Sequence, residues 1–105
     1  MSRDSRDHKD LQVCRQVHDA LSYALAEIDD PLIDDLVLAS VVPAPSASRV
    51  EITFVPSRPE YDFAAGLERL RRFEPELRQE VASEIHRKRV PVLVFRIVHP
   101  VQFAD

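Results

Sequence analysis

The sequence of 105 residues contains one glycine, Gly66, and one cysteine, Cys14. One glycine cannot build the glycine-rich loop that cradles phosphates in many nucleotide-binding proteins, so that class of site is excluded. One cysteine cannot form a disulfide within the chain, which fits a reducing compartment. No stretch approaches the roughly 18 apolar residues of a membrane span, and the polar first ten residues lack the apolar segment of a secretory signal. We therefore expect a cytoplasmic protein with no membrane partner.

Patterns of metal ligands and catalytic groups are also missing. The four histidines, His8, His18, His86 and His99, are scattered, and no two lie four residues apart. Cys14 falls on the apolar face of a predicted helix, which is typical of a small core residue rather than a nucleophile. We therefore expect no metal, no cofactor, no small-molecule substrate and no enzymatic activity.

Charged residues are abundant but unevenly distributed. There are 14 Lys and Arg against 18 Asp and Glu, and the net charge of −4 argues against a general, non-specific nucleic-acid binder. Five acids and no base fall between Glu27 and Asp35. They could form a divalent-cation site, but no calcium-loop pattern accompanies them, so solubility and repulsion of RNA are the preferred interpretation. Lys and Arg gather instead between Arg69 and Arg89, which predicts a molecule with an acidic end and a basic edge.

The hydrophobic pattern of the first half predicts a helix and two strands. Residues 10–28 carry apolar side chains every three or four positions, as in an amphipathic helix that Asp7 or Asp10 could cap. Residues 36–42 are continuously apolar and predict a well-covered strand. Residues 49–55 alternate and predict a strand with one solvated face. The short proline-containing connection predicts that the two strands form an antiparallel hairpin.

The second half predicts a broken helix and a third strand. Asp62 could cap the helix, and Pro75 interrupts its apolar rhythm, so we expect a kink or a restart there. Residues 90–98 are mostly β-branched or aromatic and predict a strand buried on both faces for much of its length. Because it follows a helical crossover, this strand should run parallel to the second one. The helices should pack on one face of the sheet.

Within this order, α-β-β-α-α-β, the sequence resembles bacterial ribosome-binding factor A, which has a type II K-homology-like fold. The most specific part is the strand Arg89-Val90-Pro91-Val92-Leu93-Val94-Phe95 after a basic helix end. Further matching residues are Leu67, Leu70, Arg72, Leu77, Arg78, Glu80, Ile85 and the Asp30-Pro31 turn. The helix break carries Pro75 where the family shows glycine. The resemblance implies an α+β domain with a three-stranded mixed sheet over residues 8–98. Residues 1–7 cannot bury apolar surface, so we expect them to form a disordered tail, and residues 99–105 to form a C-terminal tail.

The resemblance also implies a non-enzymatic, monomeric factor for ribosome biogenesis and rRNA processing. Such a factor binds the small ribosomal subunit and contacts its ribosomal RNA. The candidate RNA-binding residues are Arg69, Arg71, Arg72, Arg78, Arg87, Lys88 and Arg89. The alternative for these residues is a solvated helix face, since Glu68–Arg72, Glu74–Arg78 and Glu84–Lys88 are spaced as helical ion pairs. The alternative for the whole protein is a K-homology-like protein-interaction module that has lost RNA binding.

Overall fold

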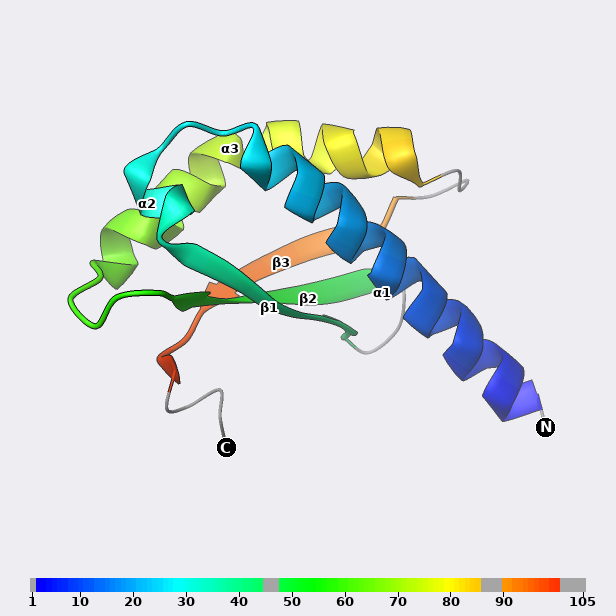
Figure 1. The fold of residues 1–105 in the computed structure, drawn as a ribbon. Helices are drawn as coiled ribbons and strands as arrows, with labels where there is room; N and C mark the ends of the chain where they lie inside the picture. Colours follow the sequence, from blue (N-terminus) through cyan, green and yellow to red (C-terminus); the bar gives the residue numbers. More distant parts are fainter. Residues whose placement is uncertain (1, 45–47, 86–89, 101–105) are drawn as a thin grey trace.

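In the part of the chain that the structure describes, helices cover one face of a three-stranded sheet (Figure 1). The structure is a computed structural model that describes residues 2–44, 48–85 and 90–100. Along the chain the elements are α1 (Ser2–Ala26), α2 (Pro31–Asp34), β1 (Leu36–Pro43), β2 (Arg49–Pro56), α3 (Phe63–Glu84) and β3 (Val92–Ile97). The sheet order is β1-β2-β3, with β1 antiparallel and β3 parallel to β2. The predicted α+β class, mixed sheet and strand directions are confirmed.

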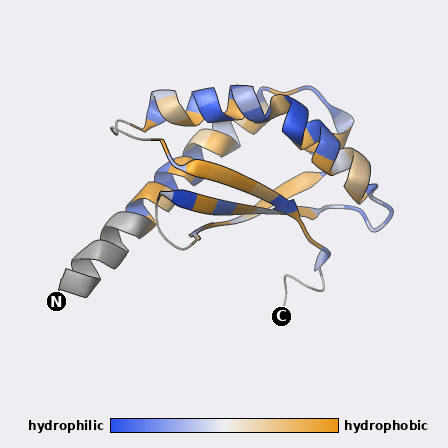
Figure 2. Cartoon of the chain, turned by 180° about the vertical axis from the view of Figure 1, so that it is seen from behind, coloured by the Kyte–Doolittle hydropathy of each residue, from blue (hydrophilic) through white to orange (hydrophobic). Residues whose placement is uncertain are grey.

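The core lies between the sheet and the two long helices. Every second residue of β2 points toward the helices, and Figure 2 shows the matching alternation of hydrophobic and hydrophilic residues along this strand. The residues of β2, α1 and α3 that meet there, each at most 1% exposed, are Val50, Ile52, Phe54, Val17, Leu21, Leu70, Leu77 and Val81. Cys14 is 4% exposed in the same cluster, as predicted for a small core residue.

The two edge strands, β1 and β3, are more exposed to solvent than their apolar sequences predicted. Val37 and Val42 of β1 are 53% and 43% exposed, and Val92 of β3 is 48% exposed. The helices cover only one face of the sheet, so outward-facing side chains of the two edge strands meet solvent. The predictions of a well-covered first strand and of a last strand buried on both faces for much of its length are therefore wrong. The central strand is the better buried one, and even Thr53, which alternation places on the open face, is only 6% exposed.

α1 begins earlier than predicted. Its helical backbone starts at Ser2, within the predicted tail over 1–7, so neither Asp7 nor Asp10 is an N-cap. Once the packed part of a helix has formed, each added residue gains a hydrogen bond without a new nucleation cost. This explains how α1 extends past the end of the sheet (Figure 1).

A short second helix follows the predicted turn. Asp30 caps α2 with its side chain, and Pro31 occupies the first turn, where its missing N–H is not needed. α2 has four residues, too few for hydrophobic periodicity to predict it.

α3 is one helix that bends near Pro75. Figure 1 shows its two halves pointing in different directions. Pro75 has no N–H to donate to the carbonyl of Arg71, and its ring crowds that carbonyl, so a straight helix is disfavoured. Of the two predicted outcomes, the kink is observed. Leu70 before the bend and Leu77 after it are both fully buried, so the two halves pack on the same core.

Candidate nucleic-acid interface on α3

α3 carries the four candidate arginines that the structure describes. Its start is fixed by Asp62, whose carboxylate accepts a 3.0 Å hydrogen bond from the Ala65 N–H, as predicted. One face of the helix is buried in the core, and the arginines occupy the remaining faces. Two of these arginines, Arg69 and Arg72, are engaged in ion pairs, and Arg71 and Arg78 have no such partner among the described residues.

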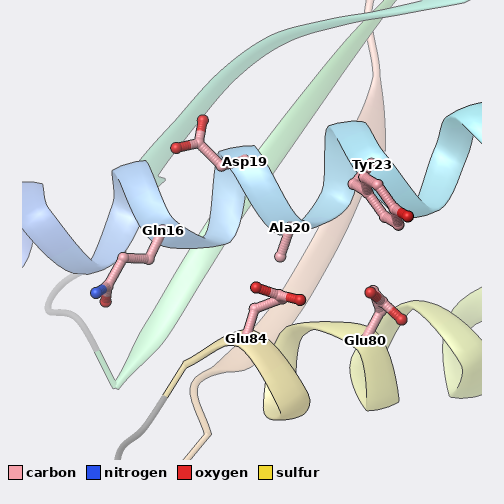
Figure 3. A pocket seen from close by; sticks show the side chains of 6 residues that line it. All are labelled: Gln16, Asp19, Ala20, Tyr23, Glu80 and Glu84. Carbon is pink, nitrogen blue, oxygen red and sulfur yellow. The ribbon is translucent and has the colours of Figure 1, made fainter.

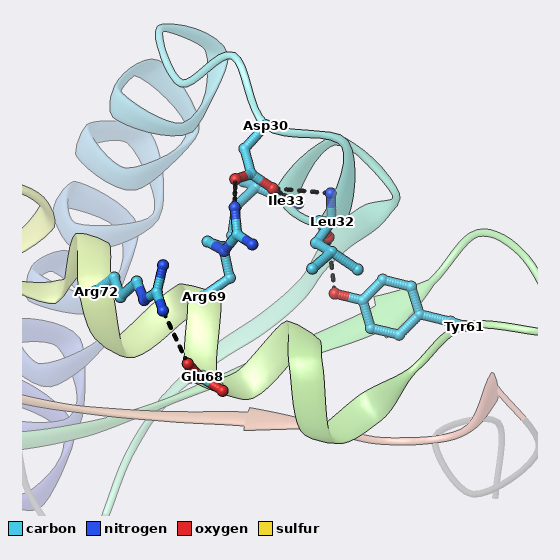
Figure 4. Close-up of polar contacts among 7 residues, drawn as sticks. All are labelled: Asp30, Leu32, Ile33, Tyr61, Glu68, Arg69 and Arg72. Carbon is cyan, nitrogen blue, oxygen red and sulfur yellow. Dashed lines mark hydrogen bonds and ion pairs between the residues drawn. The ribbon is translucent and has the colours of Figure 1, made fainter.

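Arg69 reaches back to α2 rather than out to solvent. Its guanidinium pairs with the carboxylate of Asp30 (Figure 4), and the side chain of Asp30 is only 7% exposed. The second carboxylate oxygen of Asp30 accepts hydrogen bonds from the N–H groups of Leu32 and Ile33, at 2.9 and 3.3 Å. A buried carboxylate requires such partners, because removing it from water without them is costly. The contact therefore gives Arg69 a structural role.

A second contact attaches α2 to the start of α3. The Tyr61 hydroxyl donates a 2.7 Å hydrogen bond to the carbonyl of Leu32. The ring of Tyr61 also lies over Gly66, and a Cβ at that position would fall 2.5 and 2.6 Å from two ring carbons. The single glycine of the chain is thus needed for this close approach. Burial raises the pKa of Tyr61, and the nearby carboxylates of Asp35, Asp30 and Asp62 raise it further.

Arg72 pairs with Glu68 across one helical turn. The Nη2–Oε1 distance is 3.0 Å, and the side chains are 65% and 66% exposed, so this predicted pair is confirmed. Exposed pairs of this spacing contribute only about 0.2–0.5 kcal/mol. Arg72 could therefore exchange its partner for a phosphate at little cost. The predicted pair between Glu74 and Arg78 is not formed in the structure.

Arg71 and Arg78 are exposed, and neither has an ion-pair or hydrogen-bond partner among the described residues. They are seven positions apart, so they project from the same side of α3, one before Pro75 and one after it. These two guanidinium groups are the most available cations on the described part of the helix. The other three candidates, Arg87, Lys88 and Arg89, lie outside the described residues.

Sequence analysis did not select Arg49, the first residue of β2. It is exposed and has no ion-pair partner within the described ranges. The β2–β3 register places it opposite Val92, at the beginning of β3. The alternation of β2 already put Arg49 on the solvated face. Its location beside β3, which follows the basic stretch 86–89 in sequence, required the tertiary structure.

The acidic stretch after α1 is partly neutralised. Asp30 pairs with Arg69, and Asp35 lies 2.7 Å from Arg58. Over residues 2–44, 48–85 and 90–100, no group of three or more His, Cys, Asp or Glu is arranged to hold a metal ion. No helix in the same ranges is long and apolar enough to cross a membrane.

Comparison with known proteins identifies similar folds. No protein-family model matches the chain, and no curated protein matches its sequence. Among solved structures, ribosome-binding factor A from Thermus thermophilus aligns with a TM-score of 0.66 and 24% identity, covering 88% of this chain and 93% of that one. A Thermotoga maritima protein provisionally described as a ribosome binding factor A aligns with a TM-score of 0.61 and 12% identity, covering 85% and 82%. The chain therefore shares the fold of these two proteins.

Proposed function

We propose that this protein belongs to the ribosome-binding factor A family and acts as a cytoplasmic maturation factor. It binds the small ribosomal subunit as a monomer, contacts its ribosomal RNA during assembly and processing, and catalyses no reaction. The observation that carries this proposal is the shared fold, which extends over 88% of the chain. The sequence resemblance at Leu67, Leu70 and the strand from Arg89 to Phe95 supports it independently of the fold comparison.

In this proposal the arginines of α3 neutralise RNA phosphates. Arg71 and Arg78 are available without breaking an existing pair, and Arg72 gives up only a weak exposed one. Arg87, Lys88 and Arg89, which follow α3 in the sequence, are proposed to contact RNA as well. Arginine suits the task because its planar guanidinium can donate two parallel hydrogen bonds to a phosphate. Arg69 is expected to act indirectly, by holding α2 against α3.

The net charge of −4 does not exclude RNA binding, but it restricts how the protein can bind. A protein with excess negative charge is repelled by RNA in most orientations, so a productive encounter requires the basic edge to face the phosphates. Folded ribosomal RNA is recognised largely through shape and backbone contacts. An oriented, shape-dependent interaction therefore fits the charge distribution better than general RNA binding.

The second candidate is a protein-interaction module that has kept the fold and lost RNA binding. It is favoured by the net charge and by the ion pairs that already engage Arg58, Arg69, Arg72 and Arg96. Sedimentation of a cell extract at low salt separates the candidates. Migration with small subunits supports the first candidate, and migration with an RNA-free protein complex supports the second.

The direct test measures binding to purified small subunits over a salt series. We expect the double variant Arg71→Gln/Arg78→Gln to weaken binding and to reduce the slope of log K against log salt by about one for each phosphate that is no longer neutralised. The matched control, Arg58→Gln/Arg96→Gln, removes the same charge from other elements. Equal effects of the two variants, or no effect of either, would remove α3 from the interface.

The stretch that lies outside the described residues needs its own variant. Replacing Arg87, Lys88 and Arg89 by alanine should lower the affinity and the salt slope if this basic stretch contacts RNA. An unchanged affinity and an unchanged slope would exclude these three residues as the contact.

A further inference from the structure

A groove separates α1 from the second half of α3. Its larger hollow, about 660 Å³, is lined by residues of both helices, among them Asp19, Ala20, Glu80 and Glu84 (Figure 3). A smaller hollow of about 160 Å³ continues it toward the end of α1. Tyr23 and Glu80 line both hollows, so the two form one continuous groove.

The groove has an apolar floor and an acidic rim. The apolar residues of the lining are Ala24 and Ile28, which are partly exposed, and Ala20 and Leu77, which are only 3% and 0% exposed. The rim carries five carboxylates, from α1, the residue that follows it, and α3: Asp19, Glu27, Glu76, Glu80 and Glu84. No Lys or Arg is among the lining residues within the described part of the chain.

The fold gains nothing from this arrangement of charge. Glu76, Glu80 and Glu84 follow one another at four-residue intervals on one side of α3, and like charges at this spacing repel. None of the three has an ion-pair partner among the described residues. Asp19 lies 3.4 Å from the ring of His18, and this contact is an ion pair only when the histidine is protonated.

An aromatic side chain is exposed in the middle of the groove. Tyr23 projects from α1, is 65% exposed and lies above Glu80 of α3 (Figure 3). An aromatic face attracts cationic side chains, and tyrosine is enriched at protein interfaces because it offers both an apolar ring and a polar end. The combination of apolar floor, exposed ring and carboxylate rim matches a long aliphatic stem that ends in a positive charge.

We propose that this groove docks a Lys- and Arg-rich polypeptide segment of a partner protein. The aliphatic stems of the segment lie along the floor and against Tyr23, and their charged ends pair with the rim. RNA is excluded as the occupant, since five carboxylates would face its phosphates. The inference does not depend on the proposed function, because it concerns the α1–α3 groove and not the arginines of α3.

The test uses a synthetic peptide of about 15 residues, made of lysine and arginine with leucine at every third or fourth position so that it can form an amphipathic helix. Its binding to the full chain is measured by fluorescence anisotropy at low salt. The groove variant Glu76→Gln/Glu80→Gln/Glu84→Gln should weaken binding about tenfold, and the difference should shrink as salt is added. The matched control Asp29→Asn/Asp34→Asn/Glu60→Gln removes three exposed acids outside the groove and should change binding less than about twofold.

Two further measurements keep the result independent of folding. The groove variant should unfold at the same or a higher urea concentration than the parent, because it removes like-charge repulsion. The peptide should shift the amide NMR signals of Ala20, Tyr23 and Ala24, whereas an RNA hairpin should leave them unmoved. The proposal is overturned if the control variant loses as much affinity as the groove variant, if a peptide with glutamine in place of every cation binds equally well, or if the RNA moves the groove signals.

Discussion

Replacing Asp30 with alanine should destabilise the protein by about 2–4 kcal/mol, because this one side chain serves two structural contacts. Loss of the cap on the N–H groups of Leu32 and Ile33 accounts for about 0.5–2 kcal/mol. Loss of the charged interaction with Arg69 accounts for about 1.5–3 kcal/mol. The sum is reduced by the desolvation cost that a buried carboxylate no longer incurs.

Two companion variants separate these contributions. Asp30→Asn keeps a good capping side chain and loses the charge, so it should cost about 1–2 kcal/mol, less than the alanine variant. Arg69→Met keeps the aliphatic packing and leaves the buried carboxylate without its cation, so it should cost about 1–3 kcal/mol. The double variant should cost less than the sum of the two.

The assay is urea unfolding followed by circular dichroism, with the parent, the two single variants and the double variant compared as a double-mutant cycle. We expect a coupling of about 1 kcal/mol or more between Asp30 and Arg69, against less than about 0.5 kcal/mol between the exposed Glu68 and Arg72. A coupling for Asp30 and Arg69 as small as that of the exposed pair would refute the structural role assigned to Arg69. It would also return Arg69 to the set of available RNA-binding residues.

Three further predictions concern the same region. Gly66→Ala should lower the free energy of unfolding in urea by about 1–3 kcal/mol, although alanine has the better helix propensity. The reason is that Tyr61 cannot move away from the added Cβ without losing its hydrogen bond to α2. A more stable variant would contradict this packing. Pro75→Ala should change the free energy of unfolding by less than about 1 kcal/mol, because the helix halves before and after the bend are both packed on the core. A loss above about 2 kcal/mol would show that the proline is itself required. The raised pKa of Tyr61 implies stability that is present below about pH 10 and is lost as pH rises toward the folded-state value. Urea unfolding from about pH 9 upward should show this decline, Tyr61→Phe should lessen it, and an equal decline in the variant would assign it to other groups.

Local patterns in the sequence were sufficient to predict much of the fold. Alternation over 49–55 predicted the orientation of β2, a helical crossover predicted that β3 runs parallel to it, and Pro75 predicted the bend in α3. Each signal depends on residues close together in the chain, where backbone geometry leaves few options. The N-cap at Asp62 was likewise predicted from residues that are close together in the chain.

The errors have a common physical origin. The runs 36–42 and 90–98 are apolar enough for central strands, but coverage is set by position in the sheet, and both strands are at its edges. The contact between Asp30 and Arg69 joins residues 39 positions apart, and no local pattern could predict it. Helical spacing likewise predicted an ion pair for both Arg72 and Arg78. Of these two, Arg72 is paired and Arg78 has no partner among the residues that the structure describes. Only the tertiary structure therefore shows which arginines are available to bind phosphate.

The two proposed surfaces use charged residues on different sides of α3. At about 100° per residue, Arg71 and Arg78 project from one side of the helix, while Glu76, Glu80 and Glu84 project from roughly the opposite side, toward α1. The buried face lies between them, fixed on the core by Leu70 and Leu77. A rigid core contact on this face prevents the helix from rotating, so neither surface can replace the other. Phosphates and a cationic segment could then be bound at the same time, and charge reversal on one side should leave binding at the other unchanged.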